Sequence, residues 1–194
     1  MSLALRAVFN RWRRRIVQAW MHRRVFGERS QERLLAHTRI SPSTCIEHEA
    51  GLVLGDYVFI GHFCFIDASH GVSLDEGVQV TSHVCIVSHS SHRALRLLGR
   101  AYVQQQGVPP GYVTGAVRIG AYSFIGPHSV IEAGTTLGRG TLVRAGSVVR
   151  GTFPDFAVLA GNPAQVVGDT REKDEAWLAE HPELRAHYDA WARR

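Results

Sequence analysis

The chain has 194 residues, of which 45% are hydrophobic and 20% charged. That length supports one domain with a sizeable core and leaves no room for a second catalytic domain. No apolar run reaches the ~18 residues that span a bilayer, and the N-terminus lacks the uncharged core of a signal peptide, so we expect a cytoplasmic protein. Its three cysteines form no CxxC motif, which argues against a disulfide framework and a structural metal.

The net charge of +5 originates at the N-terminus, because residues 1–27 contain seven arginines and no acidic residue. Apolar side chains recur there every three or four positions, which predicts an amphipathic helix over residues 3–25 within an N-terminal segment 1–36. Three roles stay open for this helix. It caps the domain or packs on a neighbouring subunit, it lies on an anionic membrane surface such as the inner membrane, or it binds nucleic acid. The last is disfavoured because no nucleic-acid motif accompanies the arginines.

A hydrophobic repeat of about six residues follows, and it is imperfect in its first part. Its aliphatic positions are Ile40, Ile46, Leu52, Leu54, Ile60, Ile66, Val72, Leu74, Val80 and Ile86. Two-residue shifts in phase, such as that between Leu52 and Leu54, indicate insertions at corners. Between Ile86 and Ile119 the repeat fails, which predicts a long excursion over about residues 88–116, and loops of that length are usually functional or disordered.

From Ile119 the repeat is regular. Aliphatic residues occupy positions 119, 125, 131, 137, 143 and 149, and Ser or Thr occupies 123, 129, 135, 141 and 147. A period of six fits neither a helix nor an alternating strand. It fits an all-β solenoid, a parallel β-helix in which coils stack about 4.8 Å apart and like positions form ladders. We assign residues 37–168 to this domain.

Residues 169–194 are charged and predict a short helical tail. Asp169 with Glu172 resembles a capping box, and Pro182 is placed to start a second short helix.

The start of the excursion offers the best candidate for catalysis. The segment VSHSSHRALR places His89 and His92 where the chain leaves the coil. An imidazole, with an unperturbed pKa of ~6.5, is a natural proton acceptor near neutral pH. No serine occurs in a G-x-S-x-G setting and Cys85 is expected to be packed, so direct transfer between two substrates is favoured over an acyl-enzyme.

These features together resemble the hexapeptide-repeat acyltransferases, in particular the branch that acetylates hydroxyls of sugars and cell-surface polysaccharides. The resemblance covers residues 40–167 and rests on the hexads, the SHSSH turn and the closing segment with AGNPA at 160–164. It implies a left-handed coil, a homotrimer with active sites between subunits, and acetyl-CoA as donor without a metal. His89 matches the catalytic base, with His92 as second choice.

The resemblance also implies a path for coenzyme A along the later coils. The positions that match it are Pro127, Ala145, Gly146, Ala160, Gly161, Asn162 and Pro163. Gln165 and Gly151 stand where many family members carry lysine, so Arg150 or Arg144 is expected to meet the nucleotide phosphates. Asp67 is a candidate to accept hydrogen bonds from the acceptor sugar, although a corner aspartate that bonds its own backbone is an equally good interpretation.

The expected function is therefore acetyl-CoA-dependent O-acetylation of a sugar, a polysaccharide or a lipid-linked glycan precursor. N-acetylation of an amino sugar is the alternative, because one histidine can serve either nucleophile. A zinc carbonic anhydrase that uses His83, His89 and His92, and a non-catalytic scaffold, are further alternatives.

Overall fold

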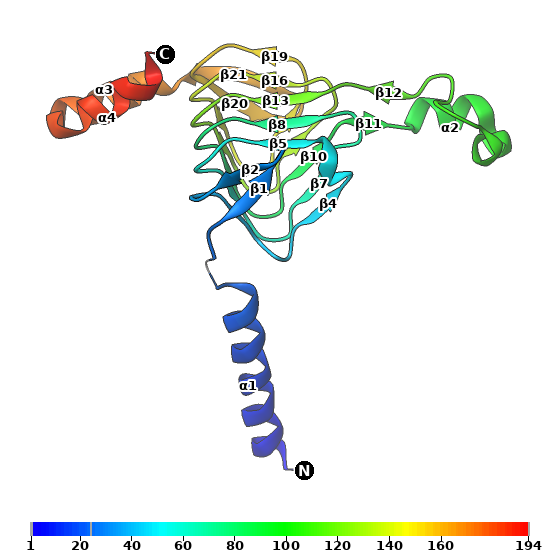
Figure 1. Ribbon diagram of the computed structural model, residues 1–194, viewed down its shortest axis with the longest axis horizontal. Coiled ribbons are helices and arrows are strands. Elements are labelled where there is room, and N and C mark those ends of the chain that lie inside the picture. Colours follow the sequence, from blue (N-terminus) through cyan, green and yellow to red (C-terminus); the bar gives the residue numbers. More distant parts are fainter. Residues whose placement is uncertain (1, 24, 194) are drawn as a thin grey trace.

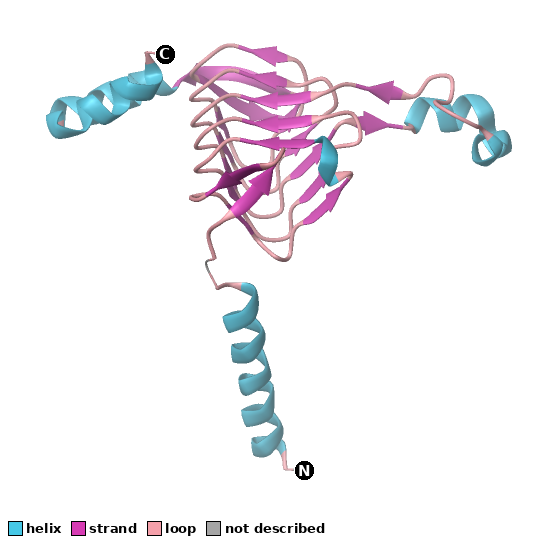
Figure 2. Cartoon of the chain, viewed as in Figure 1, coloured by secondary structure: helices cyan, strands magenta, loops and turns pink. Residues whose placement is uncertain are grey.

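The computed structural model describes residues 2–23 and 25–193 as a parallel β-helix that carries three projecting helical segments (Figures 1 and 2). Met1, Arg24 and Arg194 fall within the predicted terminal segments and lie outside the described residues. A hairpin of β1 (Glu28–Ser30) and β2 (Arg33–Leu35) precedes the first coil, and the repeat did not predict it.

Each coil contributes one short strand to each of three faces. The first face contains β3 (Arg39–Ile40), β6 (Phe59–Ile60), β9 (Gln79–Val80), β14 (Phe124–Ile125), β17 (Leu142–Val143), β20 (Ala157–Gly161) and β21 (Ala164–Asp169). The second contains β4 (Cys45–Glu47), β7 (Phe65–Asp67), β10 (Cys85–Val87), β15 (Val130–Ile131) and β18 (Val148–Val149). The third contains β5 (Leu52–Leu54), β8 (Val72–Leu74), β13 (Val117–Ile119), β16 (Thr136–Leu137) and β19 (Thr152–Phe153).

The registers confirm that the six-residue repeat builds the core. Ile66 pairs with Ile46 on one side and Ile86 on the other, and Ile86 pairs with Ile131. The regular aliphatic positions from Ile119 to Val149 are at most 2% exposed. Burial of one such side chain contributes about 1.5–3 kcal/mol, so these ladders are the main source of stability.

The small polar residues of the repeat sit in the corners, where their hydroxyl groups satisfy backbone carbonyls. Ser129 donates to the carbonyl of Arg144 in the next coil at 3.1 Å, and Thr141 donates to that of Gly138 at 2.7 Å. Both hydroxyl residues are at most 1% exposed. A larger side chain would not fit there, and an apolar one would leave these bonds unmade.

We name the corners by the faces they join. The first corner lies between the first and second faces, the second corner between the second and third, and the third corner between the third and first. The 3-10 helix η1 (Glu49–Gly51) lies in the second corner. The predicted excursion leaves from the same corner after Val87 and returns at Val117, which pairs with Val72.

The excursion is folded. It consists of an antiparallel ribbon of β11 (His89–Ser90) and β12 (Val113–Thr114), with α2 (His92–Leu98) and η2 (Gly99–Gln104) at its tip. It projects sideways from the coil in Figure 1. No periodic signal in the sequence indicated the helices at its tip.

The two ends of the chain are helical. Helix α1 (Leu3–Met21) extends away from the N-terminal end of the coil in Figure 1 and buries none of its residues, so within one chain it does not cap the coil. The tail contains α3 (Thr170–Glu180), η3 (Pro182–Leu184) and α4 (Arg185–Ala192). Asp169 is the N-cap of α3, and Trp191 of α4 stacks on Tyr122.

Candidate active site

His89 lies at the root of the excursion, where the second face ends. The carbonyl of Ser88 accepts a hydrogen bond from the Gly115 amide at 3.0 Å, and His89 pairs with Thr114 across the ribbon. The backbone of His89 is therefore held between the coil and the returning strand. Its side chain remains 29% exposed, so a substrate can reach the ring.

The Asp67 carboxylate lies beneath this imidazole, one coil below. Its Oδ2 is 2.5 Å from Nδ1 of His89, and its side chain is 1% exposed. The coil register explains the contact, because Asp67 pairs with Val87, two residues before His89. Two consecutive coils thus bring an acid and a base together although they are 22 residues apart.

Four further donors hold the same carboxylate in place, one of them the backbone amide of Ser88, which donates to Oδ2 at 3.3 Å. The backbone amide of Ser69 donates to Oδ1 at 3.1 Å, and the hydroxyls of Ser69 and Ser88 donate to Oδ2 at 3.2 and 3.1 Å. Burial acts to raise the pKa of Asp67, but the hydrogen bonds from Ser69 and His89 outweigh it and the pKa is lowered. The carboxylate is therefore ionised at neutral pH.

An ionised carboxylate can only accept hydrogen bonds, so it places the imidazole proton of His89 on Nδ1. That leaves the lone pair on Nε2. Among the described residues none contacts Nε2 within hydrogen-bond distance, and the nitrogen is available to a substrate. The pair has the geometry of a general base oriented by a buried acid.

This placement of Asp67 differs from the expected contact with an acceptor sugar. The carboxylate is buried, and its oxygens are engaged by Ser69, Ser88 and His89. The alternative of a corner aspartate that bonds its own backbone fits one part of the geometry, since Oδ1 accepts from the amide two residues on. The contact with His89 was not expected.

Two aromatic rings flank the His89 imidazole. The ring of Tyr112 stacks on it with centroids 5.2 Å apart and planes 18° apart, and His70 lies 5.9 Å away. Burial raises the pKa of Tyr112, so its hydroxyl stays protonated near neutral pH. Tyr112 belongs to the excursion, which thereby forms one wall of the site.

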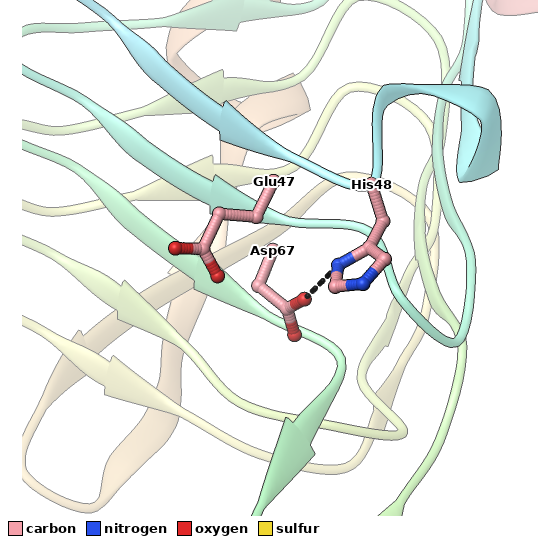
Figure 3. Close-up of side chains that lie close together, drawn as sticks. All are labelled: Glu47, His48 and Asp67. Atoms are coloured by element: carbon pink, nitrogen blue, oxygen red, sulfur yellow. Dashed lines mark ion pairs between the residues drawn. The ribbon is translucent and has the colours of Figure 1, made fainter.

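Glu47 and His48 border the site on the next coil below. Figure 3 shows the His48 ring turned toward the Asp67 carboxylate, with 3.6 Å between Nδ1 and Oδ1. The side-chain ligand atoms of Glu47, His48 and Asp67 lie within 4.8 Å of one another, a spacing that could hold a metal ion. The Asp67 carboxylate is already hydrogen-bonded to His89, however. The exposed side chains of Glu47 and His48 are well placed to contact a polar substrate.

His92 is less well placed than His89. It is the first residue of α2 and is exposed, and its Nδ1 lies 2.7 Å from the Ser90 hydroxyl. No described carboxylate orients it. The structure also separates the histidines of the carbonic anhydrase alternative, because His83 lies in the first corner, stacked on His128 at 4.9 Å, and His89 in the second.

Most of the residues expected to bind coenzyme A form one exposed strip along the first corner. The amide of Gly146 donates to the carbonyl of Pro127 at 2.9 Å, which stacks the turn that contains Ala145 on the turn below. Above them, the Arg144 amide donates to the Leu159 carbonyl at 2.9 Å, and the β20–β21 turn, which spans Ala160 to Pro163, follows directly.

Gly146 leaves this strip open. Its φ is +72°, and a Cβ built there would meet nothing within 4 Å, so the turn presents bare backbone to solvent. Arg150 does not join the strip, because it follows β18 and lies in the second corner. Arg144, within the first corner beside Ala145, is the better placed arginine.

Cys85, the cysteine on the strand that leads to His89, is unsuited to nucleophilic attack. Cys85 lies in β10, and burial together with the Asp67 charge raises the pKa of its thiol. A protonated thiol is a weak nucleophile.

Comparisons with known proteins agree with this fold. Residues 116–151 match the sequence model of the family described as "Bacterial transferase hexapeptide (six repeats)". The chain is 31% identical over 144 residues to a probable acetyltransferase of Mycobacterium tuberculosis, an alignment that covers 74% of the chain and 46% of that relative. It is 27% identical over 129 residues to the putative lipopolysaccharide biosynthesis O-acetyl transferase WbbJ of Escherichia coli, covering 65% of the chain and 64% of WbbJ.

The chain thus spans less than two thirds of either relative. Among solved structures, a hexapeptide-repeat acetyltransferase of Vibrio cholerae in complex with acetyl coenzyme A superposes with a TM-score of 0.55 and 21% identity. That superposition covers 69% of this chain and 68% of the other. The hexapeptide repeats and the likeness to this solved structure imply that the coil is left-handed.

Proposed function

The chain carries the hexapeptide repeat of bacterial transferases and is related to acetyltransferases, and on that premise we propose that it transfers an acetyl group from acetyl-CoA to a hydroxyl of a sugar or glycan. The observation that carries this proposal is the contact between Asp67 and His89 beside the excursion. A buried carboxylate that fixes the tautomer of a partly exposed histidine is the arrangement a general base needs.

In the proposed reaction, Nε2 of His89 accepts the proton of the acceptor hydroxyl while the oxygen attacks the thioester carbonyl. The carbon–sulfur bond then breaks, and the coenzyme A thiolate takes the proton back from the imidazolium. Asp67 stabilises the positive charge that the ring carries between these steps. The raised pKa of Cys85 supports direct transfer rather than an acyl-enzyme.

We place the donor along the first-corner strip, where backbone groups from Pro127 to Pro163 are exposed. Arg144 is the proposed partner of the nucleotide phosphates, because an arginine fork binds phosphate in a bidentate manner. The solved relative that contains acetyl coenzyme A supports this choice of donor.

The strip and the base lie on different corners of one chain, separated by the strands of the second face. A site that uses both therefore needs a second copy, whose first corner faces His89. This geometry supports active sites between subunits, and the resemblance to the hexapeptide-repeat acyltransferases implies that the assembly is a homotrimer. The acceptor would enter beside Tyr112, with His48 and Glu47 available for its hydroxyl groups.

Release of free thiol from acetyl-CoA, measured with a panel of glycosides and glycan fragments, tests the activity. We expect turnover with at least one acceptor, and a loss on the order of 10²–10⁴-fold in His89→Ala, the usual contribution of a general base. His92→Ala is the matched control and should stay within about twofold. Mild alkali removes esters and spares amides, so product mass before and after treatment separates O- from N-acetylation.

Mixed trimers test the position of the site. His89→Ala and Ala145→Trp should each be inactive, the second because a large side chain blocks the donor strip. After the two variants are unfolded together and refolded, some trimers would pair an intact base with an intact strip and regain activity. If the site lay within one chain, mixing would restore nothing.

A further inference from the structure

Helix α1 carries an apolar stripe that the protein leaves uncovered. It is 19 residues long and buries none of them. At 100° per residue, seven side chains fall within about a third of the helix circumference. They are Leu5, Val8, Phe9, Trp12, Ile16, Ala19 and Trp20, and each of the large ones is at least 54% exposed.

Outside the stripe the helix surface carries five arginines, together with Leu3, Asn10, Val17 and Gln18. Arg13 and Arg6 border one edge of the stripe and Arg15 borders the other, while Arg11 and Arg14 lie on the opposite side. No acidic residue occurs before Glu28. A long arginine side chain at the edge of an apolar stripe can reach toward charged headgroups while its methylene groups stay in the apolar zone.

The helix is tethered to the coil rather than packed on it. Just beyond its C-terminal end, the ring of His22 lies against the ring of His62, with centroids 4.2 Å apart. The stretch after the helix is also apolar and open, with Val25 and Phe26 about 60% and 59% exposed. Figure 1 shows α1 pointing away from the excursion and the tail.

From the stripe and its charged surroundings we infer that α1 binds the surface of an anionic lipid bilayer, with its axis in the membrane plane. Tryptophan and aliphatic side chains on one face and arginines on the other are typical of interfacial helices. The helix does not cross the bilayer, because none of the described helices is long and apolar enough to do so.

The charge of the segment favours an anionic bilayer as the partner of α1 over a bundle formed with the α1 helices of other copies. Seven arginines per chain without an acidic partner in residues 1–27 would repel one another in such a bundle. The remainder of the chain has 15 basic and 17 acidic residues and is nearly neutral, so it offers little compensation. Anionic lipid headgroups supply the missing counter-charge.

The experiment is sedimentation of the full-length protein with vesicles of phosphatidylcholine alone and of phosphatidylcholine with phosphatidylglycerol. We expect binding to the anionic vesicles only, weakened by high salt because screening shortens the range of the attraction to about 3 Å at 1 M. Replacement of Arg13, Arg14 and Arg15 by Gln should weaken binding by about fivefold per arginine, on the order of 100-fold in all.

A pair of variants with the same change of charge tests insertion of the stripe. Ile16→Glu places a carboxylate in the stripe, and Gln18→Glu places one on the arginine side. Ile16→Glu should bind at least tenfold more weakly than Gln18→Glu, since it also loses the burial of an aliphatic side chain. Equal binding by the two variants would overturn the inference, because the arginines would then act by charge alone.

Two further results would also overturn it. One is equal binding to neutral and anionic vesicles. The other is an Ile16→Glu variant that changes the oligomeric state in light scattering while the wild-type protein ignores vesicles, which would assign the stripe to other copies of the chain. Since acetyl transfer is assayed separately with soluble acceptors, loss of vesicle binding and loss of activity are distinguishable.

Discussion

Replacement of Asp67 by Asn tests the catalytic arrangement most directly, because it removes the charge and keeps the shape. In the native protein the carboxylate accepts from His89 at 2.5 Å and from Ser69 and Ser88 at 3.1–3.2 Å. The amide oxygen of asparagine can replace only one of the two acceptor atoms. If the amide nitrogen faces His89, the ring must carry its proton on Nε2 and cannot act as a base.

The size of the effect follows from the hydrogen bond that is lost. A bond to a charged group contributes about 1.5–3 kcal/mol, which corresponds to about 10- to 150-fold in rate at 1.36 kcal/mol per decade. This is the minimum loss, because the wrong tautomer would add to it. We therefore expect kcat to fall by about 10²-fold in Asp67→Asn while KM for acetyl-CoA stays constant, since the donor strip lies on another corner.

The assay is thiol release at saturating acetyl-CoA with the best glycoside acceptor, together with calorimetric titration of coenzyme A and thermal unfolding by circular dichroism. Combination with His89→Ala should give no further loss, because Asp67 acts only through that ring. An Asp67→Asn protein that folds, binds coenzyme A and keeps its kcat within twofold would refute the role given to the carboxylate.

Three further predictions concern the fold and the substrate wall. In steady-state kinetics, Tyr112→Ala should raise KM for the acceptor at least fivefold and leave KM for acetyl-CoA unchanged. A raised KM for acetyl-CoA with an unchanged KM for the acceptor would instead place Tyr112 on the donor side. Ile86→Ala, at a position with 0% exposure, should lower the free energy of unfolding by about 2–5 kcal/mol in urea titrations, and a loss under 1 kcal/mol would contradict its place in the core. Although burial acts to raise the pKa of Asp56, hydrogen bonds from His37, Tyr57 and Thr38 hold it at about 2, below its ordinary value of 3.8. The ionised group thus stabilises the fold above about pH 4, and this contribution is lost as the pH falls toward 2. Between pH 2 and 5, the free energy of unfolding of Asp56→Asn, measured in urea, should therefore depend less steeply on pH than that of the wild type.

The regular part of the sequence predicted the coil because a single period governs both burial and stacking. The residues at positions 119 to 149 that the hexads marked as apolar are the ones buried in the ladders, and the failure of the hexads marked the excursion. The hairpin of β1 and β2 escaped prediction because two three-residue strands carry no period. The interior of the excursion escaped for the same reason.

His89 was singled out by its position, whereas the partner of its ring was not. The signal was present, because the spacing that places Ile66 beneath Ile86 also places Asp67 beneath Val87, directly before Ser88 and His89. Applying the same offset once more would have brought Glu47 next to Asp67. Contacts between chains have no comparable signal, since one period describes only how a chain stacks on itself.

The way the ribbon joins the coil has an evolutionary consequence. The chain leaves the coil after Val87 and rejoins it at Val117, which pairs with Val72. Strand pairing on both sides of the excursion therefore does not depend on the sequence of the excursion. Recombination or insertion could exchange the 22 residues 91–112, between the two strands of the ribbon, and reshape the wall around the imidazole without refolding the column. New acceptor preferences could then arise by transplanting a single segment, while the acid–base pair and the donor strip are inherited unchanged.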